Sequence, residues 1–576
     1  MANFRSILIL FFIVSSSLVS AQQKVLVTFS DKKDVQFDPY EYFDTKAIER
    51  RNELGLSLYD PTDFPVNEKY VQITTSACTE VLVVSRWLNG IICKAETNQI
   101  EKLKKLPFVL EVEILDKPEK AAAGMIKGVN DLSDTDLKLL KSQTARMGAQ
   151  DFAQNNITGK GVRVAIFDIG FESYKTNPSF EHIRSANRIV KTWDFVEKKE
   201  NVDGHNTHGT FVLSCVAGRI EGIQIGLAID AEFLLARTET WTEFFSEEEQ
   251  WLAAAEWADK NGAHIINSSL GYTYHRYFPE QMNGKKSLVS RAANMAARKG
   301  ILVVNSAGNE GDGKWKIIGT PADADSVLSI GGISPWTGFH TGFSSFGPTS
   351  DKRMKPNVTA YGHVIGAGPG GLSQTQGTSF SGPLTAGFAA CAKQARPNMT
   401  NMQLFKEIEK SADLYPYFDY AHGYGVPQAS YFFRKNTMEE KPERLVEIED
   451  ANGKLNIKIL DVVQFSLNED SDTSLREASN EAIETEIVED ESKTEDTYYL
   501  KWPDYVFYHI ENSKGYLDKY WVVDPQPNYS YIFKNLGNST KAEANVSPLI
   551  INKADFAKPF TLRVFYKGQI STYTVN

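Results

Sequence analysis

The chain has 576 residues, 42% of them hydrophobic and 23% charged, and a formal net charge of −11. The ordinary apolar fraction excludes a wholly disordered or collagen-like chain, and the length predicts about three or four domains at roughly 100–200 residues each. The acidic balance argues against a nucleic-acid-binding protein, because phosphate recognition needs clustered Lys and Arg.

The first 21 residues carry a basic Arg5, an apolar stretch from Ile7 to Val14, and small residues up to Ala21. This pattern predicts a secretory signal peptide. A membrane anchor is the alternative, but it needs about 20 apolar residues, and this stretch is about half as long. We therefore expect a mature protein without a membrane span, either secreted or located in the periplasm or at the cell surface.

Residues 22–118 contain two short β-rich runs, Lys24 to Phe29 and Gly90 to Ala95, around a helical pattern from Asn98 to Leu106. These features predict a small α+β unit. A Lys-rich, Gly-containing stretch from Lys117 to Val129 then indicates an exposed linker.

Residues 119–435 begin with a helical pattern from Leu137 to Gln154, after which strands and helices alternate to about Phe433. Such alternation predicts an α/β domain with a mostly parallel sheet covered by helices on both faces.

Residues 436–576 carry alternating strand patterns, among them Gly453 to Leu460 and Phe560 to Phe565, which predict a β-sandwich-like domain. Between positions 466 and 497 lie 12 acidic and 2 basic residues, so this run alone contributes −10 of the net −11. We expect the run to form a solvated, poorly ordered loop.

Four cysteines are too few for a disulfide scaffold. Cys215 and Cys391 lie in apolar helical patterns, where buried, inert thiols are expected. A bridge between these two cysteines, or between Cys78 and Cys93, stays open at this point.

Three segments of the central domain carry groups suited to one mechanism. Asp168 ends the apolar run Val164 to Phe167, and His208 precedes the apolar helical run Phe211 to Gly218. Ser379 lies at a loop-to-helix junction, where its hydroxyl and its backbone N–H point the same way. A serine hydroxyl becomes a strong nucleophile when a base takes its proton and a third group orients that base. The chain order Asp, His, Ser matches one known arrangement of such triads.

Two further strands complete the candidate site. Asn309 follows the strand Ile301 to Ser306, and its side-chain amide could donate to a developing oxyanion. Ser269, Leu270 and Gly271 end another strand, whose edge could pair with an extended peptide. His205 is a competing base, and with His208 it could form a metal pair, although no ligand cluster with zinc spacing lies nearby.

Taken together, these motifs resemble the subtilisin-like serine proteases from about Gly159 to about Ala429. The resemblance rests on Asp-x-Gly, His-Gly-Thr, Ser-Leu-Gly, Ala-Gly-Asn and Gly-Thr-Ser, which occur in that order at residues 168, 208, 269, 307 and 377. The stretches Leu234 to Glu239, Glu256 to Asp259 and Ser268 to Tyr272 are similar to the branch found in Bacteroidetes-type bacteria.

The resemblance implies a secreted serine endopeptidase that acts on polypeptides through Asp168, His208, Ser379 and Asn309. It implies a seven-stranded sheet and an N-terminal propeptide, here residues 22–118, that inhibits the enzyme until self-cleavage removes it. It also implies substrate contacts at Ser269, Leu270, Gly271, Ala307 and Gly308, with Gly319 as the floor of a roomy specificity pocket. No cofactor is required for this chemistry, and structural calcium, common in the family, has no assignable ligands here.

Four positions depart from the family pattern without touching the triad: Ile169, Ile229, Asn357 and Tyr361. A catalytically silent binding or adhesion protein on the same scaffold is the alternative function, but such proteins usually lose a triad residue. An esterase of the α/β-hydrolase type would need Gly-x-Ser-x-Gly with the histidine last in sequence, and the chain has neither feature.

Overall fold

A computed structural model describes residues 23–115, 132–240, 246–273, 276–434, 444–460, 504–525 and 549–576. The predicted signal peptide and the acidic run at 466–497 lie outside these ranges. The described chain divides into two compact units: one contains residues 23–37 and 59–115, and the other contains residues 38–58 and the described residues from 132 onward.

The first unit is a four-stranded antiparallel sheet in the order β2-β3-β1-β4. Val25, Val27, Ile91 and Cys93 alternate inward and form its core with the helices. The α+β prediction for this region is therefore confirmed, with helix α4 ending three residues before the expected Leu106. The elements are β1 (Gln23–Phe29), α3 (Glu68–Ala77), β2 (Glu80–Ser85), β3 (Gly90–Ala95), α4 (Thr97–Leu103) and β4 (Val109–Leu115).

The central domain is built on a seven-stranded sheet in the order β13-β12-β11-β10-β5-β9-β6, with every neighbouring pair parallel. Six of its strands are almost wholly buried, as expected when helices cover both faces, whereas the edge strand β6 is buried only at Asp194. The strands are β5 (Arg163–Asp168), β6 (Ile189–Asp194), β9 (Glu232–Arg237), β10 (Ile265–Ser268), β11 (Leu302–Ser306), β12 (Val327–Ile333) and β13 (Val358–Tyr361).

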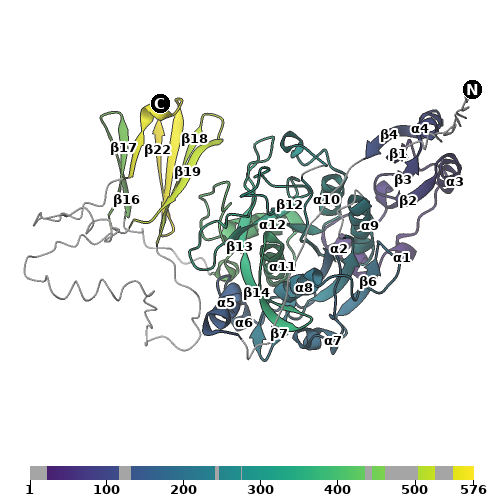
Figure 1. The fold of residues 1–576 in the computed structure, drawn as a ribbon, viewed down its shortest axis with the longest axis horizontal. Coiled ribbons are helices and arrows are strands. Elements are labelled where there is room, and N and C mark those ends of the chain that lie inside the picture. Colours follow the sequence, from purple (N-terminus) through teal and green to yellow (C-terminus); the bar gives the residue numbers. More distant parts are fainter. Residues whose placement is uncertain are drawn as a thin grey trace, which may run out of the picture. The chain divides into compact units, whose positions relative to one another are not determined.

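Two pairs of helices pack on this sheet (Figure 1): α8 (His208–Ala217) lies against α11 (Thr378–Ala395), and α9 (Ser246–Lys260) lies against α10 (Leu288–Arg298). The helix expected from Leu137 to Gln154 is split into two helices, because Gly148 adopts a left-handed conformation between them. The remaining elements are α1 (Pro39–Tyr42), α2 (Thr45–Glu53), α5 (Asp134–Ala145), α6 (Ala149–Gln154), α7 (Glu181–Arg184), β7 (Arg219–Ile220), β8 (Ile223–Gln224), β14 (His363–Gly368), β15 (Gly371–Gln376) and α12 (Asn401–Ser411).

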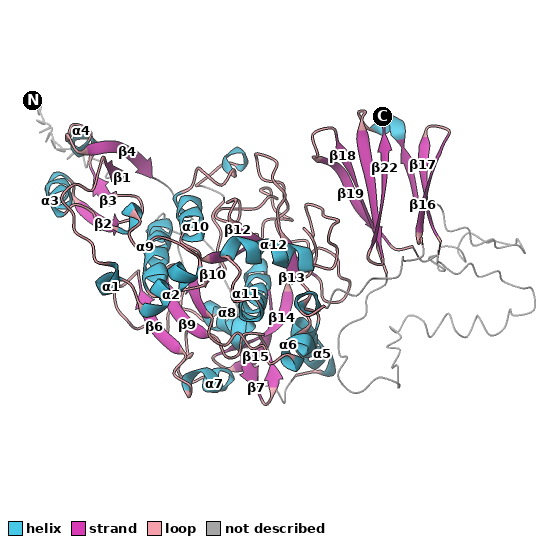
Figure 2. Cartoon of the chain, turned by 180° about the vertical axis from the view of Figure 1, so that it is seen from behind, coloured by secondary structure: helices cyan, strands magenta, loops and turns pink. Residues whose placement is uncertain are grey.

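The C-terminal domain consists of two antiparallel sheets, visible in Figure 2, with the orders β16-β17-β20 and β19-β18-β21-β22. One hydrophobic core contains side chains from both sheets, including Leu455, Ile551, Ile510 and Leu562. This confirms the β-sandwich-like prediction. The strands are β16 (Val446–Ala451), β17 (Lys454–Ile459), β18 (Val506–Asn512), β19 (Leu517–Val523), β20 (Leu549–Asn552), β21 (Phe560–Tyr566) and β22 (Gln569–Val575).

All four cysteines are buried free thiols, so neither of the two bridges left open by the sequence is formed. Burial raises the pKa of Cys215 to about 12 and also raises that of Cys391. Among the described residues, no helix is both long enough and apolar enough to cross a membrane.

Candidate active site

The candidate site lies where the order of the central sheet changes direction along the chain. From β5 the chain continues to β6 and β9 on one side, and then crosses to β10 and the later strands on the other. In open α/β sheets, ligands bind outside the carboxyl ends of strands at such a point. Asp168 is the last residue of β5, and Ser269 directly follows β10, which is the neighbour of β5.

His208 and Asp168 form a close pair at this edge. His208 Nδ1 lies 2.9 Å from Asp168 Oδ1 and 3.0 Å from Oδ2, and the Asp168 side chain is almost fully buried. The backbone N–H of Ile169 donates a further bond of 2.9 Å to Oδ1. The carboxylate therefore receives two donors without the hydroxyl that the family usually has at position 169.

The start of helix α8 brings His208 against β5 through local contacts. Asn206 Oδ1 accepts the His208 backbone N–H at 2.8 Å, and the Gly209 N–H donates to the Gly170 carbonyl at 3.1 Å. A Cβ on Gly209 would lie only 2.4 Å from that carbonyl oxygen and 2.9 Å from Asp168 Cβ. Only glycine allows the histidine to approach the aspartate this closely.

The electrostatics of the pair shift the pKa of His208 upward. Burial of His208 opposes its charge, but the negative charge of Asp168 and their hydrogen bond outweigh this effect and raise the histidine pKa. The His208 side chain keeps 30% of its surface exposed, and the Phe380 ring lies 5.4 Å away, between centroids. Nothing in the sequence pattern singles out Phe380.

Ser379 lies in the first turn of α11, as the loop-to-helix prediction requires. Its Oγ donates to the Ser269 carbonyl at 3.1 Å, and its own carbonyl accepts the Ser269 hydroxyl at 2.9 Å. Asn267 Nδ2 donates to the same Ser269 Oγ at 3.1 Å. These bonds tie the end of β10 to the start of α11. The Ser379 N–H belongs to the first helical turn, whose N–H groups have no acceptor within the helix.

Asn309 is held by Thr378, a residue whose role the sequence analysis missed. Asn309 Oδ1 accepts both the Thr378 N–H and the Thr378 hydroxyl, each at 2.9 Å. The Thr378 Oγ1 also accepts the Gly308 N–H at 3.2 Å. Because the Asn309 oxygen receives these two donors, its amide NH₂ is free to point elsewhere, and a Cβ built on Gly377 would lie 3.4 Å from Nδ2. In the sequence, the threonine of the Gly-Thr-Ser motif is the feature from which this role could have been inferred.

The remaining sequence-predicted residues gather around this centre. The Gly319 N–H donates to the Ala307 carbonyl at 3.3 Å, and the Leu270 carbonyl accepts the Asn305 amide at 2.9 Å. In the part of the chain that the structure describes, the Gly271 N–H and carbonyl have no partner, and the residue is exposed. A Cβ on Gly319 would lie 2.8 Å from Thr273 Cγ2.

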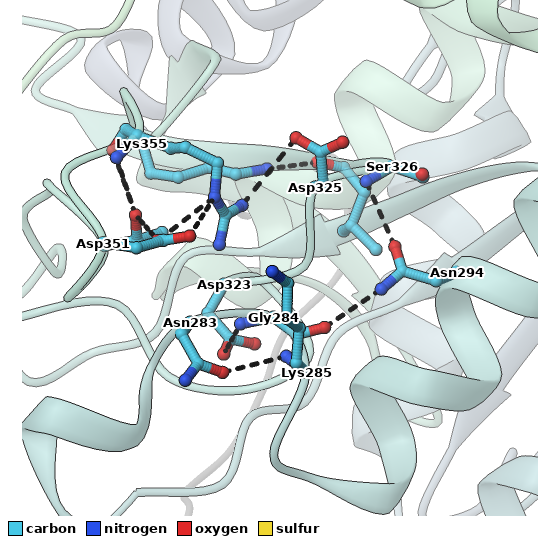
Figure 3. A network of polar contacts seen from close by, with 12 residues as sticks. Asn283, Gly284, Lys285, Asn294, Asp323, Asp325, Ser326, Asp351 and Lys355 are labelled. Atoms are coloured by element: carbon cyan, nitrogen blue, oxygen red, sulfur yellow. Dashed lines mark hydrogen bonds and ion pairs between the residues drawn. The ribbon is translucent and has the colours of Figure 1, made fainter.

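A polar network supports the loop that follows Gly319 (Figure 3). In Figure 3, Asp323 accepts the Gly284 N–H at 2.7 Å. Asp323 also accepts the Ser290 hydroxyl at 2.6 Å, and the Ser290 hydroxyl bonds in addition to Thr320. Nearby, the fully buried Lys355 amine donates to Val327 O, and burial lowers its pKa to about 7. The loop is therefore fixed by buried side chains instead of being free to move.

His205, the competing base, lies apart from the histidine–aspartate pair. Its Nε2 is 3.6 Å from Asp194 and 3.5 Å from Glu197. Among the described residues, these three side chains are the group whose ligand atoms are close enough for a metal ion. Arg237 Nη1, however, lies 2.9 Å from Asp194 and 3.3 Å from Glu197, so a cation already pairs with both carboxylates. His208 pairs with Asp168 instead.

Of the positions that depart from the family pattern, Asn357 has a defined structural role. Its Oδ1 accepts the Ser329 N–H at 2.9 Å and the Lys355 amine at 3.0 Å, and its Nδ2 donates to Glu409 at 2.8 Å. An amide can donate and accept at once, so this position is fully bonded without an aspartate.

Comparisons with known proteins identify two domains along the chain. Residues 159–425 match the subtilase family, Peptidase S8, and residues 24–127 match the Peptidase S8 propeptide domain of Bacteroidota. Alkaline elastase YaB from a Bacillus species is 27% identical over 56% of this chain and 79% of its own length. Subtilisin E from Bacillus subtilis is 27% identical over 57% and 76%.

Among solved structures, MycP1 from Mycobacterium smegmatis is similar at 21% identity and a TM-score of 0.43, over 57% of this chain and 94% of that one. The two family matches lie side by side along one sequence, a propeptide domain followed by the domain with the Asp168–His208 pair and Ser379. Residues 159–425 are therefore a subtilase domain of the serine endopeptidase type, and residues 24–127 are its Peptidase S8 propeptide domain.

Proposed function

We propose that this protease cleaves polypeptides with Ser379 as nucleophile, His208 as general base and acid, and Asp168 as the group that orients His208. The observation that carries the proposal is the 2.9 Å contact between His208 Nδ1 and Asp168, beside a serine in the first turn of a helix. With Nδ1 bound to the carboxylate, Nε2 is the nitrogen left to receive a proton.

The reaction begins when the Ser379 hydroxyl turns from the Ser269 carbonyl toward His208 Nε2. Its oxygen forms a bond to the scissile carbonyl carbon while its proton passes to Nε2, and the carbonyl oxygen gains the negative charge. Collapse of this intermediate breaks the C–N bond, and the amine leaves with the proton from His208. Water then repeats the sequence on the acyl-enzyme, and the acid product and free Ser379 are released.

Two donors of this chain stabilise the oxyanion: the Ser379 N–H and the Asn309 side-chain amide. Thr378 holds the Asn309 oxygen through two bonds, which fixes the direction of the NH₂ group before substrate arrives. Donors that are oriented in advance need no reorganisation during the reaction, and removing one typically slows it about 10²–10³-fold. All groups in these steps come from the chain, so the chemistry requires no cofactor, and no calcium ligands are assigned.

The substrate binds as an extended strand along Ser269 to Gly271. The Gly271 N–H and carbonyl, which have no partner among the described residues, supply the backbone bonds, and Gly319 is the floor of the pocket for the side chain that precedes the cleaved bond. Ala307 and Gly308 form the adjoining wall.

The protein is made as a secreted precursor that processes itself. A propeptide domain at residues 24–127 supports this proposal, because it precedes the protease domain and acts as an intramolecular inhibitor. The signal-like residues 1–21 support export.

The experiment compares purified wild-type protein with Ser379→Ala. A fluorophosphonate probe should label wild-type Ser379, and N-terminal sequencing should find a shortened chain in the wild type and an uncut precursor in the variant. Absence of both labelling and peptide hydrolysis in correctly folded wild type would refute the proposal and favour a silent binding protein.

A further inference from the structure

Residues 38–58 belong to the propeptide match but not to the propeptide's compact unit. The match covers residues 24–127, whereas these residues cluster with the protease domain. They form helices α1 and α2, with Ala47 and Phe43 buried on one side and Glu49 and Asn52 exposed on the other. We refer to residues 38–58 as the docked segment.

Two arginines of the docked segment share one carboxylate of the protease domain. Arg50 Nη2 binds Asp259 Oδ1, and Arg51 Nη2 binds Oδ2 at 2.7 Å. All three side chains are about 2% exposed or less. Among the described residues, the Asp259 carboxylate accepts hydrogen bonds only from these two guanidinium groups. Withdrawal of the segment would leave this acid at the end of α9 without a partner, which is costly for a buried charge.

Backbone contacts extend the anchor. The Asp44 N–H donates to the Lys260 carbonyl at 2.8 Å, Arg50 also donates to the Ala263 carbonyl, and Lys46 Nζ donates to the Gly161 carbonyl at 2.8 Å. The Arg51 guanidinium lies 4.2 Å from the centroid of the Phe43 ring. The segment thus satisfies main-chain acceptors of the protease domain that would otherwise need water.

Two glycines of the protease domain allow the docked segment to approach closely, because they have no side chain. A Cβ on Gly262 would lie 2.6 Å from Lys46 Cβ and 2.8 Å from the Ala47 nitrogen, and a Cβ on Gly300 would lie 2.4 Å from Leu54 Cδ1. Both glycines follow the C-terminal ends of helices, α9 and α10, and have a positive φ. The fit is therefore as close as that within a folded core.

The two connections to the propeptide's own unit are exposed. Lys33, Asp34 and Gln36 precede the segment, Asp38 begins it, Ser57 lies near its end and Tyr59 follows it, all with exposed side chains. Exposed turns are preferred sites of proteolytic nicking, whereas a docked helix is a poor substrate. A protease that cleaves the propeptide can therefore reach peptide bonds on both sides of the docked segment, while the segment itself is protected.

We propose that the docked segment is a permanent part of the mature protease, which keeps residues 38–58 as a separate, non-covalently bound chain after the rest of the propeptide is removed. This inference rests on the proposed processing. The partner is a segment of the same chain, and its receptor is the surface formed by Asp259, Lys260, Gly262, Ala263 and Gly300.

The first test uses wild-type enzyme incubated until no intact propeptide remains. Denaturing mass spectrometry of the native gel-filtration peak should find the protease chain together with a peptide that contains residues 38–58. An active protease chain eluting without this peptide would overturn the inference.

The second test is independent of the enzyme's own activity. Full-length Ser379→Ala carries added sites for a sequence-specific protease within residues 33–37, at 57–60 and within 116–131. After cutting, the peptide should co-elute with the protease domain at low and high salt, since a buried ion pair is poorly screened. Its separation from the domain would overturn the inference, even if wild-type processing had failed.

A double variant, Arg50→Ala with Arg51→Ala, should weaken retention of the peptide on the order of 100-fold in Kd, because it leaves Asp259 buried and unpaired. Glu49→Ala, an exposed position on the same helix, is the matched control and should retain the peptide. Equal retention by both variants would overturn the proposed anchor.

Hydrogen exchange on uncut Ser379→Ala covers the case in which the double variant does not fold. The amides of α2 should stay protected under conditions where the strands of the N-terminal unit exchange. Exchange of α2 together with that unit would contradict its assignment to the protease domain.

Discussion

The buried hydroxyl of Thr378 offers a direct test of how the oxyanion donor is positioned. In Thr378→Val, a methyl group of similar shape replaces the hydroxyl that donates to Asn309 Oδ1 at 2.9 Å and accepts the Gly308 N–H at 3.2 Å. The Thr378 backbone N–H remains as the second donor to Oδ1, also at 2.9 Å. The variant therefore loosens Asn309 without releasing it.

The expected loss of rate lies between the effect of losing one hydrogen bond and the effect of losing an oxyanion donor. One net hydrogen bond is worth about 0.5–1.5 kcal/mol, or roughly 2–13-fold in rate. Complete loss of the donor in Asn309→Ala should cost about 10²–10³-fold. We expect Thr378→Val to lower kcat about 5–10-fold with little change in KM, since the threonine contacts no substrate.

The assay is steady-state hydrolysis of a chromogenic peptide by all four proteins of the double-mutant cycle. Once Asn309 is alanine, the Thr378 hydroxyl has no amide to orient, so the second substitution should cost almost nothing. Thr385→Val is the matched control: it is buried on the same helix, and its hydroxyl donates only to the Ser381 carbonyl at 3.0 Å. An unchanged rate in Thr378→Val, or full additivity with Asn309→Ala, would refute the reasoning.

Three further results are expected. Because Asp168 raises the pKa of His208, activity should rise with pH through a value above the ordinary 6.5. The stability that the charge pair contributes is fully present below pH 6.5 and is lost over the same rise. An apparent pKa below 6.5 in the pH profile of kcat/KM would contradict this. Gly319→Val brings a Cβ within 2.8 Å of Thr273 Cγ2, which lowers kcat/KM for all substrates, and the loss should be about 10–200-fold greater for substrates with a large side chain before the cleaved bond than for those with alanine there; an equal loss for both would disprove the pocket assignment. Cys215 and Cys391 should resist iodoacetamide at pH 8 in the native protein and react after denaturation without a reductant; mass spectrometry would reveal a bridge by a missing adduct.

Much of the site could be predicted because its residues lie at the ends of strongly patterned elements. Asp168 ends a wholly apolar strand, and His208 and Ser379 begin apolar helices, so parallel-sheet geometry alone brings them to one edge. The parallel direction of the central strands followed from the alternation of strands and helices, and their number from the family resemblance. The helix break at Gly148 did not, since a single glycine within a helical pattern is often tolerated.

What could not be predicted depends on contacts between distant positions. Arg50 and Asp259 are 209 positions apart, and each belongs to an ordinary charged helix surface when read locally. Membership of the docked segment in the protease domain therefore appears only in three dimensions. The role of Thr378 is intermediate, because its motif is visible but the direction of the Asn309 amide is not.

The resting position of the Ser379 hydroxyl is compatible with catalysis on energetic grounds. It must exchange its bond to the Ser269 carbonyl for one to His208, and a single neutral hydrogen bond contributes only about 0.5–1.5 kcal/mol. The bonds that remain, from the Ser269 hydroxyl to the Ser379 carbonyl and from Asn267 to Ser269, do not involve the moving atom. They keep the substrate strand fixed relative to the nucleophile while the hydroxyl turns. The same contacts that hold the serine at rest therefore preserve the geometry in which it reacts.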